Sequence, residues 1–337
     1  MLENILIDNS EINDSINQND YSEAVRKLLI QQKIDWQFAA NGFESLKSVQ
    51  TKEFNFDGYK IKVQFNPGRI KSSSAKVDEK SIKERECFLC WENLPPGQKG
   101  ILINEEYVIL VNPFPIFPEH FTIPNFKHTQ QSIINSFPDL LEISKELSKY
   151  YTVFYNGPKC GASAPDHLHF QAGSKNFMPI DLEFEQLKNE YGNVLFEDKN
   201  IVLSAVDDGL RRFISFKSRD KYLIEHTFEK FYEHYKNISS NNNEPMMNIL
   251  ASYEKESGWQ IIIFLREKHR SSHYFAQDEN QILISPAAVD LGGIFITPRQ
   301  KDFEIISTNI IKEICDEITL AKEKFDILKY NLREKNS

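Results

Sequence analysis

The sequence predicts an α+β fold with antiparallel sheets and flanking helices. Segments in which apolar and polar residues alternate, as in half-buried strands, occur in both halves of the chain. Segments with apolar residues at every third or fourth position, as in amphipathic helices, lie between them. The chain has 337 residues, which is enough for one large domain or two ordinary ones. Because strands and helices recur in both halves, we expect two related modules in tandem.

An N-terminal helical segment is expected over residues 1–55, where Ala24, Leu28 and Leu29 recur at helical spacing. A first module is expected over 56–180 and a second over 181–337. The first should contain strands at 58–67, within 100–124 (a hairpin and a further strand), at 150–157 and at 166–173, and a helix over 132–150. The second should contain strands at 200–206, 211–217, 246–254, 259–267, 281–289 and 293–298, and helices over 221–238 and 303–332.

Composition excludes several classes of protein. The chain has 40 Lys and Arg against 49 Asp and Glu, a net charge of −9, which argues against a protein that coats nucleic acid. Apolar runs such as Ile261–Leu265 are too short to span a bilayer, so no membrane partner is expected. The first residues lack the pattern of a secretory signal. Only 4 cysteines are present, so a disulfide scaffold is not expected and a cytoplasmic location fits best.

The most informative segment is 155–173, YNGPKCGASAPDHLHFQAG. His167, His169 and Gln171 alternate, so in a strand their side chains would share one face at intervals of about 7 Å. The loop before them offers backbone N–H groups that can surround an anion. A neutral imidazole is available near pH 7 and can attack phosphorus. The residues alone leave open that these are two surface histidines whose alternation is accidental.

Cys87 and Cys90 form a C-x-x-C pair, ECFLC. Such a pair is compatible with zinc binding, with redox chemistry or with two inert buried thiols. The βαβ pattern that accompanies a thioredoxin-like redox pair does not surround it. Zinc would require two further ligands.

Two segments carry basic residues suited to phosphate. In FNPGRIKSS, Arg69 offers a planar fork for phosphate oxygens, with Asn66 beside it. A plain turn at Pro67–Gly68 explains the same residues. In FLREKHRSSH, the cations Arg266, Lys268 and Arg270 form a positive patch that could receive a second phosphate group, although a solvated strand end explains it equally well.

The segment that ends in HLHFQAG resembles the active-site motif of the histidine-triad superfamily, in the branch whose third member is Gln. This branch includes galactose-1-phosphate uridylyltransferase, diadenosine tetraphosphate phosphorylases and GDP-L-galactose phosphorylase. The resemblance implies histidine-triad-like sheets and a nucleotidyltransferase or phosphorylase that acts through a covalent nucleotidyl-histidine. It implies that His169 is the nucleophile and that Gln171 supports the phosphate. The substrate-binding residues it implies are Asn66, Arg69, Asn156 and Ser163, with the backbone of Gly161 as the alternative to Ser163.

The same resemblance implies a metal site. The zinc-bearing uridylyltransferases combine a C-x-x-C pair with a His in a Pro-acid-His string and with the first His of the active-site strand. In this sequence these positions are Cys87, Cys90, His120 and His167. A closed tetrahedral site of this kind has no open position for water, so the zinc would be structural. His128 is expected to face solvent.

The implied substrate is a nucleotide sugar or a dinucleotide, with phosphate or a sugar phosphate as acceptor. A homodimer is compatible with the resemblance, because related enzymes are often dimers. Two alternatives stay open: a zinc-stabilised nucleotide-binding protein with little turnover, and a hydrolase of the same substrates. A zinc hydrolase that holds a catalytic metal with His167 and His169 would need Asp166 as its base.

Overall fold

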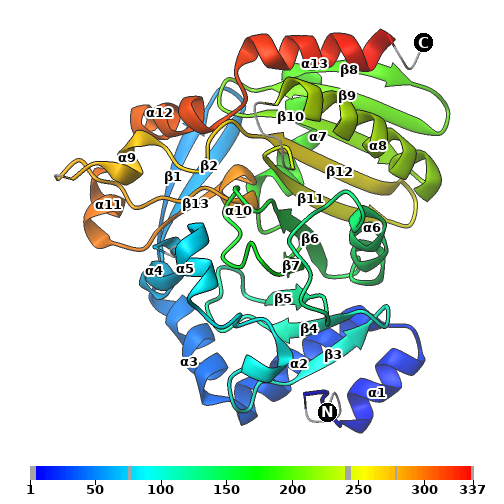
Figure 1. Cartoon of the computed structure of the whole chain (residues 1–337), viewed down its shortest axis with the longest axis vertical. Coiled ribbons are helices and arrows are strands. Elements are labelled where there is room, and N and C mark those ends of the chain that lie inside the picture. The colour runs from blue at the N-terminus through cyan, green and yellow to red at the C-terminus, as the bar shows by residue number, and fades with distance from the viewer. Residues whose placement is uncertain (1–4, 75–76, 240–243, 278, 335–337) are drawn as a thin grey trace.

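A ten-stranded antiparallel sheet runs through the molecule. The computed structural model describes residues 5–74, 77–239, 244–277 and 279–334 (Figure 1). The N-terminal half supplies β3 (Gly100–Ile103), β4 (Tyr107–Val111), β5 (His120–Pro124), β6 (Tyr151–Asn156) and β7 (His169–Ser174). The C-terminal half supplies β8 (Gly192–Glu197), β9 (Ile201–Asp207), β10 (Arg212–Ser218), β11 (Met247–Glu254) and β12 (Gly258–Leu265).

The two halves of this sheet have the same strand order. Outward from the centre, the N-terminal half runs β6-β7-β5-β4-β3 and the C-terminal half runs β11-β12-β10-β9-β8. The halves meet where β6 pairs with β11, in a register that sets Asn156 opposite Asn248. The predicted α+β fold with two related modules in tandem is therefore confirmed.

Helices cover both faces of the sheet. One hydrophobic cluster lies against α1 (Ser10–Asn17), α2 (Tyr21–Asp35), α3 (Gln37–Ser45), α6 (Phe137–Glu146), α8 (Lys221–Ile238) and α13 (Lys322–Glu334). The other lies against α7 (Pro179–Tyr191), α10 (Ala288–Leu291), α11 (Gln300–Ile305) and α12 (Thr308–Ile318). None of the helices in the described part of the chain is both long and apolar enough to cross a membrane.

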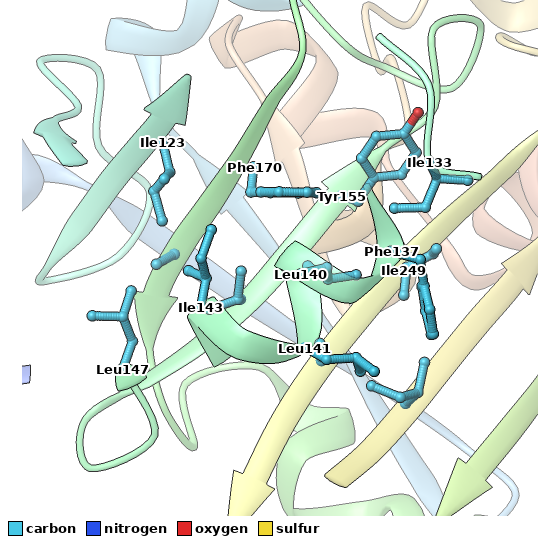
Figure 2. Packing of buried hydrophobic residues seen from close by; sticks show 14 of the residues in the cluster. Ile123, Ile133, Phe137, Leu140, Leu141, Ile143, Leu147, Tyr155, Phe170 and Ile249 are labelled. Atoms are coloured by element: carbon cyan, nitrogen blue, oxygen red, sulfur yellow. The ribbon is translucent and has the colours of Figure 1, made fainter. Parts of the chain in front are cut away.

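The packing of α6 decides which side chains of β7 face the site. The helix begins with Pro138 in its first turn, where a missing N–H costs no helical hydrogen bond. Its apolar side chains point toward the strands below it, and Phe170 of β7 points into the same cluster (Figure 2). Successive strand residues face opposite sides, so His169 and Gln171 lie on the other face of the sheet.

A second, three-stranded sheet lies beside the large one. It consists of β1 (Gln50–Phe56), β2 (Tyr59–Phe65) and β13 (Ile294–Thr297), with β13 parallel to β2. Tyr59, Ile61 and Val63 of β2 are buried, as their alternation predicts. The short helix α4 (Ile70–Ser73) follows the turn after β2. A strand from the C-terminal half thus supports the segment that carries Arg69.

The predicted long helix over 303–332 is wrong, because that segment forms α11, α12 and α13. Ser307 caps α12, with its hydroxyl accepting from the N–H of Ile310 at 3.4 Å. Leu320 leaves the helical conformation, and its N–H donates to the carbonyl of Leu265 at 3.0 Å. Hydrogen bonding to the end of β12 therefore interrupts an apolar periodicity that looks continuous in the sequence.

Other element predictions also need correction. The segment 281–289 is not a strand but an irregular run that leads into α10, and β1 begins within the segment expected to be helical. Helix α7 had no counterpart among the expected elements. The short helix α5 (Glu79–Lys83) interrupts a polar stretch before the C-x-x-C pair. The module boundaries after residues 55 and 180 stay a prediction.

Candidate active site and candidate metal centre

A cavity of about 360 Å³ lies on the face of the large sheet that carries His169. Its polar lining includes six residues predicted from the sequence: Arg69, Asn156, Gly161, Ser163, His169 and Gln171. Its apolar lining includes Phe38, Phe88, Leu94, Pro95 and Phe114. The C-terminal half adds Ser285, Ala287, Val289, Asp290 and Ile296. The fold therefore brings residues that are far apart in the sequence to one hollow.

His169 is held in a single orientation at the start of β7. Its Nδ1 lies 2.8 Å from the carbonyl oxygen of His167, and a carbonyl can only accept, so Nδ1 carries the proton. The lone pair therefore resides on Nε2. Burial lowers the pKa of His169 to about 4, which keeps the imidazole neutral at pH 7. A neutral imidazole with its lone pair on Nε2 is the form that can act as a nucleophile.

Gln131, which sequence analysis missed, ties together the two strands that carry the site. Its Oε1 accepts from the N–H of His169 at 2.8 Å, and its Nε2 donates to the carbonyl of Asn156 at 2.8 Å. The side chain is 1% exposed. It lies in the irregular segment before α6, where no periodicity or motif marks it.

His120 sets the orientation of Gln171. The N–H of Ile116 donates to His120 Nδ1 at 3.2 Å, which places the ring proton on Nε2. That Nε2 then donates to Gln171 Oε1 at 3.1 Å. The amide nitrogen of Gln171 is thereby left as a donor on the side of the cavity. Burial, together with the charge of Arg69, lowers the pKa of His120 to about 3 and keeps it neutral.

Arg69 lies half-buried at the edge of the cavity. Its Nη1 donates to the carbonyl of Phe114 at 2.7 Å, and its Nη2 donates to the hydroxyl of Ser72 at 2.8 Å. A guanidinium has five N–H donors, so these two bonds fix the fork without exhausting it. Burial lowers the pKa of Arg69 to about 10, which leaves it cationic at neutral pH.

The loop before β7 depends on glycine. Gly161 has a φ of +91°, and a Cβ at this position would lie 2.6 Å from the Cβ of Ala287. A side chain would therefore be strained in conformation and would clash. The close approach of the two segments brings Gly161, Ser163 and Ala287 to the same cavity.

Asn66 does not line this cavity. It is buried, and its Nδ2 donates to Gln64 Oε1 at 3.2 Å and to the carbonyl of Pro115 at 3.1 Å. These bonds hold the turn that follows β2, and the expected contact of Asn66 with substrate stays a prediction.

The three cations of the C-terminal segment also lie outside the cavity. Arg266, Lys268 and Arg270 line a separate groove of about 540 Å³. Lys268 Nζ lies 3.3 Å from a carboxylate oxygen of Glu317, and Arg270 Nε donates to Ser285 Oγ at 2.8 Å. Arg270 contacts the cavity lining through Ser285. The buried Arg266 donates to protein acceptors rather than toward the cavity, and the contact of these three cations with substrate stays a prediction.

Four potential metal ligands lie together beside the loop. Cys87, Cys90, His128 and His167 place one ligand atom each within 4.8 Å of one another. The Sγ of Cys87 is 3.3 Å from His167 Nδ1, and the Sγ of Cys90 is 3.1 Å from His128 Nδ1. His167 Nε2 donates to the carbonyl of Asn125 at 2.8 Å, which directs Nδ1 toward the thiols. Two thiols and two imidazoles form a donor set suited to zinc.

The predicted ligand His120 is therefore wrong, and His128 takes its place. His120 lies on β5, where it turns toward Gln171 and the cavity. His128 lies beyond the end of β5, in a segment bonded to the residue before β7, since the carbonyl of Thr129 accepts from the N–H of Leu168 at 2.6 Å. His128 lies in a loop and is exposed, as expected, but its Nδ1 also lies beside the Sγ of Cys90. Asp166, the base that a zinc hydrolase would need, pairs instead with Arg85.

Asp290 is a cavity residue that the sequence motifs do not mark. Its two carboxylate oxygens accept from the N–H groups of Ala287 at 2.9 Å and Ile296 at 3.0 Å. Burial raises the pKa of Asp290 to about 6. These bonds fix the segment that passes Gly161.

Two family models match adjoining parts of the chain. They are described as "Domain of unknown function (DUF4922)", over residues 28–174, and "GDPGP1-like, C-terminal domain", over residues 188–336. A comparison with curated proteins gave no match.

Three solved structures of the yeast Ap4A phosphorylase Apa2 are similar. The complex with AMP has a TM-score of 0.56 and 15% identity, with 84% of this chain and 95% of that chain covered. The complex with Ap4A has a TM-score of 0.54 and 15% identity, with 86% and 97% covered. A third structure has a TM-score of 0.54 and 16% identity, with 84% and 94% covered. The chain thus has the fold of the yeast Ap4A phosphorylase, and its residues 188–336 match the GDPGP1-like C-terminal domain; both findings support the resemblance to the phosphorylase and uridylyltransferase branch of the histidine-triad superfamily.

Proposed function

We propose that the protein is a nucleotidyltransferase or phosphorylase acting on a nucleoside diphosphate sugar or a dinucleoside polyphosphate. The observation that carries this proposal is the state of His169, a buried neutral imidazole whose Nδ1 proton is held by a carbonyl. Its Nε2 is the nucleophile, and the cavity around it is lined by side chains that can donate hydrogen bonds to phosphate. The yeast structures of the same fold contain AMP and Ap4A, which supports a nucleotide ligand for this chain.

Two displacements make up the proposed reaction. The Nε2 lone pair attacks the α-phosphorus, an N–P bond forms, and the P–O bond to the leaving group breaks with its electron pair on oxygen. An oxygen of phosphate or of a sugar phosphate then attacks the same phosphorus, and the N–P electron pair returns to Nε2. The proton stays on Nδ1 throughout, where it donates a hydrogen bond to the carbonyl of His167. Gln171 and Arg69 donate hydrogen bonds to the phosphate oxygens, which gain negative charge in the transition state.

The apolar part of the cavity is proposed to receive the nucleobase. Phe38 is 42% exposed and Phe88 is 45% exposed, and both line the cavity. Exposed aromatic rings at the wall of a cavity offer faces on which a base can stack. A zinc ion at Cys87, Cys90, His128 and His167 would have four protein ligands and no open position, so it would be structural, and Phe88 lies between two of those ligands. The ion would fix this ring and the start of β7 together.

An intact-mass screen tests the proposal. The protein is incubated with a panel of nucleotide sugars and dinucleoside polyphosphates, and the expected product is an adduct of one nucleoside monophosphate. A His169→Asn variant should form no adduct while it keeps its fold and metal content, and its turnover should fall by about 10⁴–10⁶-fold. An adduct on the variant would contradict the assignment of His169.

The same screen separates the alternatives. Binding of a nucleotide with neither adduct nor product would indicate a nucleotide-binding protein with little turnover. Products that form with water alone, with no stimulation by phosphate or sugar phosphates, would indicate a hydrolase.

A further inference from the structure

The side chain of Asn156 reaches the cavity with its orientation already fixed. Asn156 ends β6 and is 5% exposed. Its Oδ1 accepts from Asn248 Nδ2 at 2.8 Å and from the N–H of Ala288 at 2.8 Å. An amide oxygen has two lone pairs, and both are used here. The NH₂ group of Asn156 is therefore left as the donor toward a ligand in the cavity.

Asn248 is in turn fixed at both ends of its amide. It is completely buried on β11, directly across from Asn156. Its Nδ2 donates to Asn156 Oδ1 and, at 2.7 Å, to the carbonyl of Cys160. Its Oδ1 accepts from Arg266 Nη1 at 2.6 Å. One amide from the C-terminal half thus orients Asn156 and holds the loop that leads to Gly161.

Arg266 decides which way the amide of Asn248 points. A guanidinium donates and cannot accept, so only the oxygen of Asn248 can face it. Arg266 is 2% exposed, and its position does not depend on Asn248 alone. Its remaining donors bond to the carbonyls of Pro286, Lys268, His269 and Ile318 at 3.0, 3.0, 2.9 and 3.4 Å. Arg266 is therefore held in place independently of Asn248. Because it fixes which end of the Asn248 amide faces it, it also fixes which end of the Asn156 amide faces Asn248.

We propose that Asn248, oriented by Arg266, is a positioning residue for nucleotidyl transfer, because it makes Asn156 a donor to the transferring phosphate. This inference rests on the proposed function. A reversed Asn156 amide would direct a carbonyl oxygen, with its partial negative charge, at the phosphate. Two residues of the C-terminal half, Asn248 and Arg266, thereby decide which end of the Asn156 amide, in the N-terminal half, faces the cavity.

The Asn248→Asp variant tests this directly. The carboxylate keeps the size of the side chain and still accepts from Arg266, but it loses both Nδ2 donors. Asn156 should then turn its NH₂ toward the carboxylate and its oxygen toward the cavity. We expect the rate of adduct formation to fall by about 10²–10³-fold, the loss typical of one donor to a developing oxyanion, with a smaller change in KM. Asn248→Ala removes the same donors without adding a carboxylate, and the N–H of Ala288 still holds Asn156 Oδ1, so its loss should be smaller than that of Asn248→Asp.

A double-mutant cycle separates positioning from a merely structural role. In an Asn156→Ala background, Asn248→Asp should cause no further loss of rate, because the group on which it acts is absent. If the double variant instead loses the product of the two single-variant losses in rate, the proposal is overturned. Tyr235→Phe is the matched control, since the hydroxyl of Tyr235 lies in this buried region, where it donates to the carbonyl of Met246 at 2.7 Å and accepts from the backbone N–H of Arg266 at 3.0 Å, but does not bond to the side chain of Arg266, Asn248 or Asn156. It should lower stability and leave the rate unchanged.

A binding measurement distinguishes failure of this inference from failure of the proposed function. If the wild type forms no adduct with any substrate, the cycle is repeated on the dissociation constants of AMP, GMP and UMP. Asn248→Asp should weaken binding of the preferred nucleotide about tenfold in the wild-type background, which is about 1.4 kcal/mol, and not in Asn156→Ala. Equal weakening in both backgrounds overturns the positioning role. A wild type that binds none of the three nucleotides overturns both proposals.

Discussion

His120 Nε2 donates a hydrogen bond to the side-chain oxygen of Gln171, so the imidazole controls which end of that amide faces the cavity. The two residues lie on neighbouring strands, β5 and β7. The backbone N–H of Ile116 holds the other ring nitrogen of His120. This arrangement gives His120 a role on the phosphate side of the site rather than at the metal centre.

Replacement of His120 by Ala is expected to slow the reaction without removing metal. Gln171 would lose its fixed orientation, and we expect turnover to fall by about 10²-fold, near the lower end of the cost of losing one oriented donor. Metal content, measured by plasma mass spectrometry, should equal that of the wild type. Loss of metal in this variant would restore His120 as a ligand.

Replacement of His128 by Ala should have the opposite result. Metal binding is coupled to folding, so loss of a ligand should lower metal content and thermal stability together. A loss of about 3 kcal/mol would lower Tm by roughly 6–12 °C for a domain of 150–250 residues. Cys87→Ser should behave in the same way. An unchanged Tm in metal-free protein would contradict a structural metal.

Arg69→Ala is expected to impair turnover with little change in stability. The variant loses a cation beside the phosphate site, while the bonds to Phe114 and Ser72 lie at a half-buried edge. Arg69→Lys should recover only part of the rate, because a lysine lacks the planar fork. Ser72→Ala serves as the control for the loss of one of the bonds that hold the fork. If Arg69→Ala is unfolded by circular dichroism, the residue is structural instead.

Glu244 is expected to make stability depend on pH. Its two carboxylate oxygens accept from the hydroxyl of Tyr155 at 2.7 Å and from the N–H of Ile133 at 2.6 Å. Burial outweighs these bonds and raises the pKa of Glu244 from 4.5 to about 7. Between about pH 4.5 and 7, the carboxyl of Glu244 is deprotonated in the unfolded chain but still protonated in the folded chain. The contribution of this group to stability is therefore complete below about pH 4.5 and decreases as the pH rises to about 7.

The Glu244→Gln variant measures this contribution. Urea unfolding at several values between pH 4.5 and 7.5 should show a shallower decline of the free energy of unfolding in the variant. The difference in decline should be on the order of 3 kcal/mol. Burial also raises the pKa of Asp181 to about 7, so the free energy of unfolding should still decline somewhat with pH in both the wild type and the variant. Identical slopes would contradict the assignment to Glu244.

The local part of the site could be predicted from the sequence. His169, Gln171 and Asn156 lie in short strands, where alternation alone decides which side chains share a face. The donor set at the metal was harder to predict. His120 and His128 both follow the C-x-x-C pair, and only the register of β5 against β7 decides that His120 turns toward Gln171. Sequence spacing does not contain that register.

Residues that act through tertiary contacts escaped prediction for a related reason. Arg266 looks like part of a positive patch, but two of the carbonyls around it, those of Pro286 and Ile318, come from segments that are distant in the sequence. Gln131 and Asn248 bear no motif, and their roles exist only because β6 lies between β7 and β11. The break between α12 and α13 likewise depends on a bond to β12 that apolar periodicity does not reveal.

The pairing of β6 with β11 also determines how the chain would behave if it were cut. Each half closes an open edge of the other, with Asn248 opposite Asn156 and Ala251 opposite Val153. Either half alone would expose that strand's unpaired N–H and C=O groups, a template for aggregation. The N-terminal fragment would also lose β13, which pairs with β2. Two fragments split between β7 and β8 should therefore be poorly behaved when made separately and should complement each other when produced together.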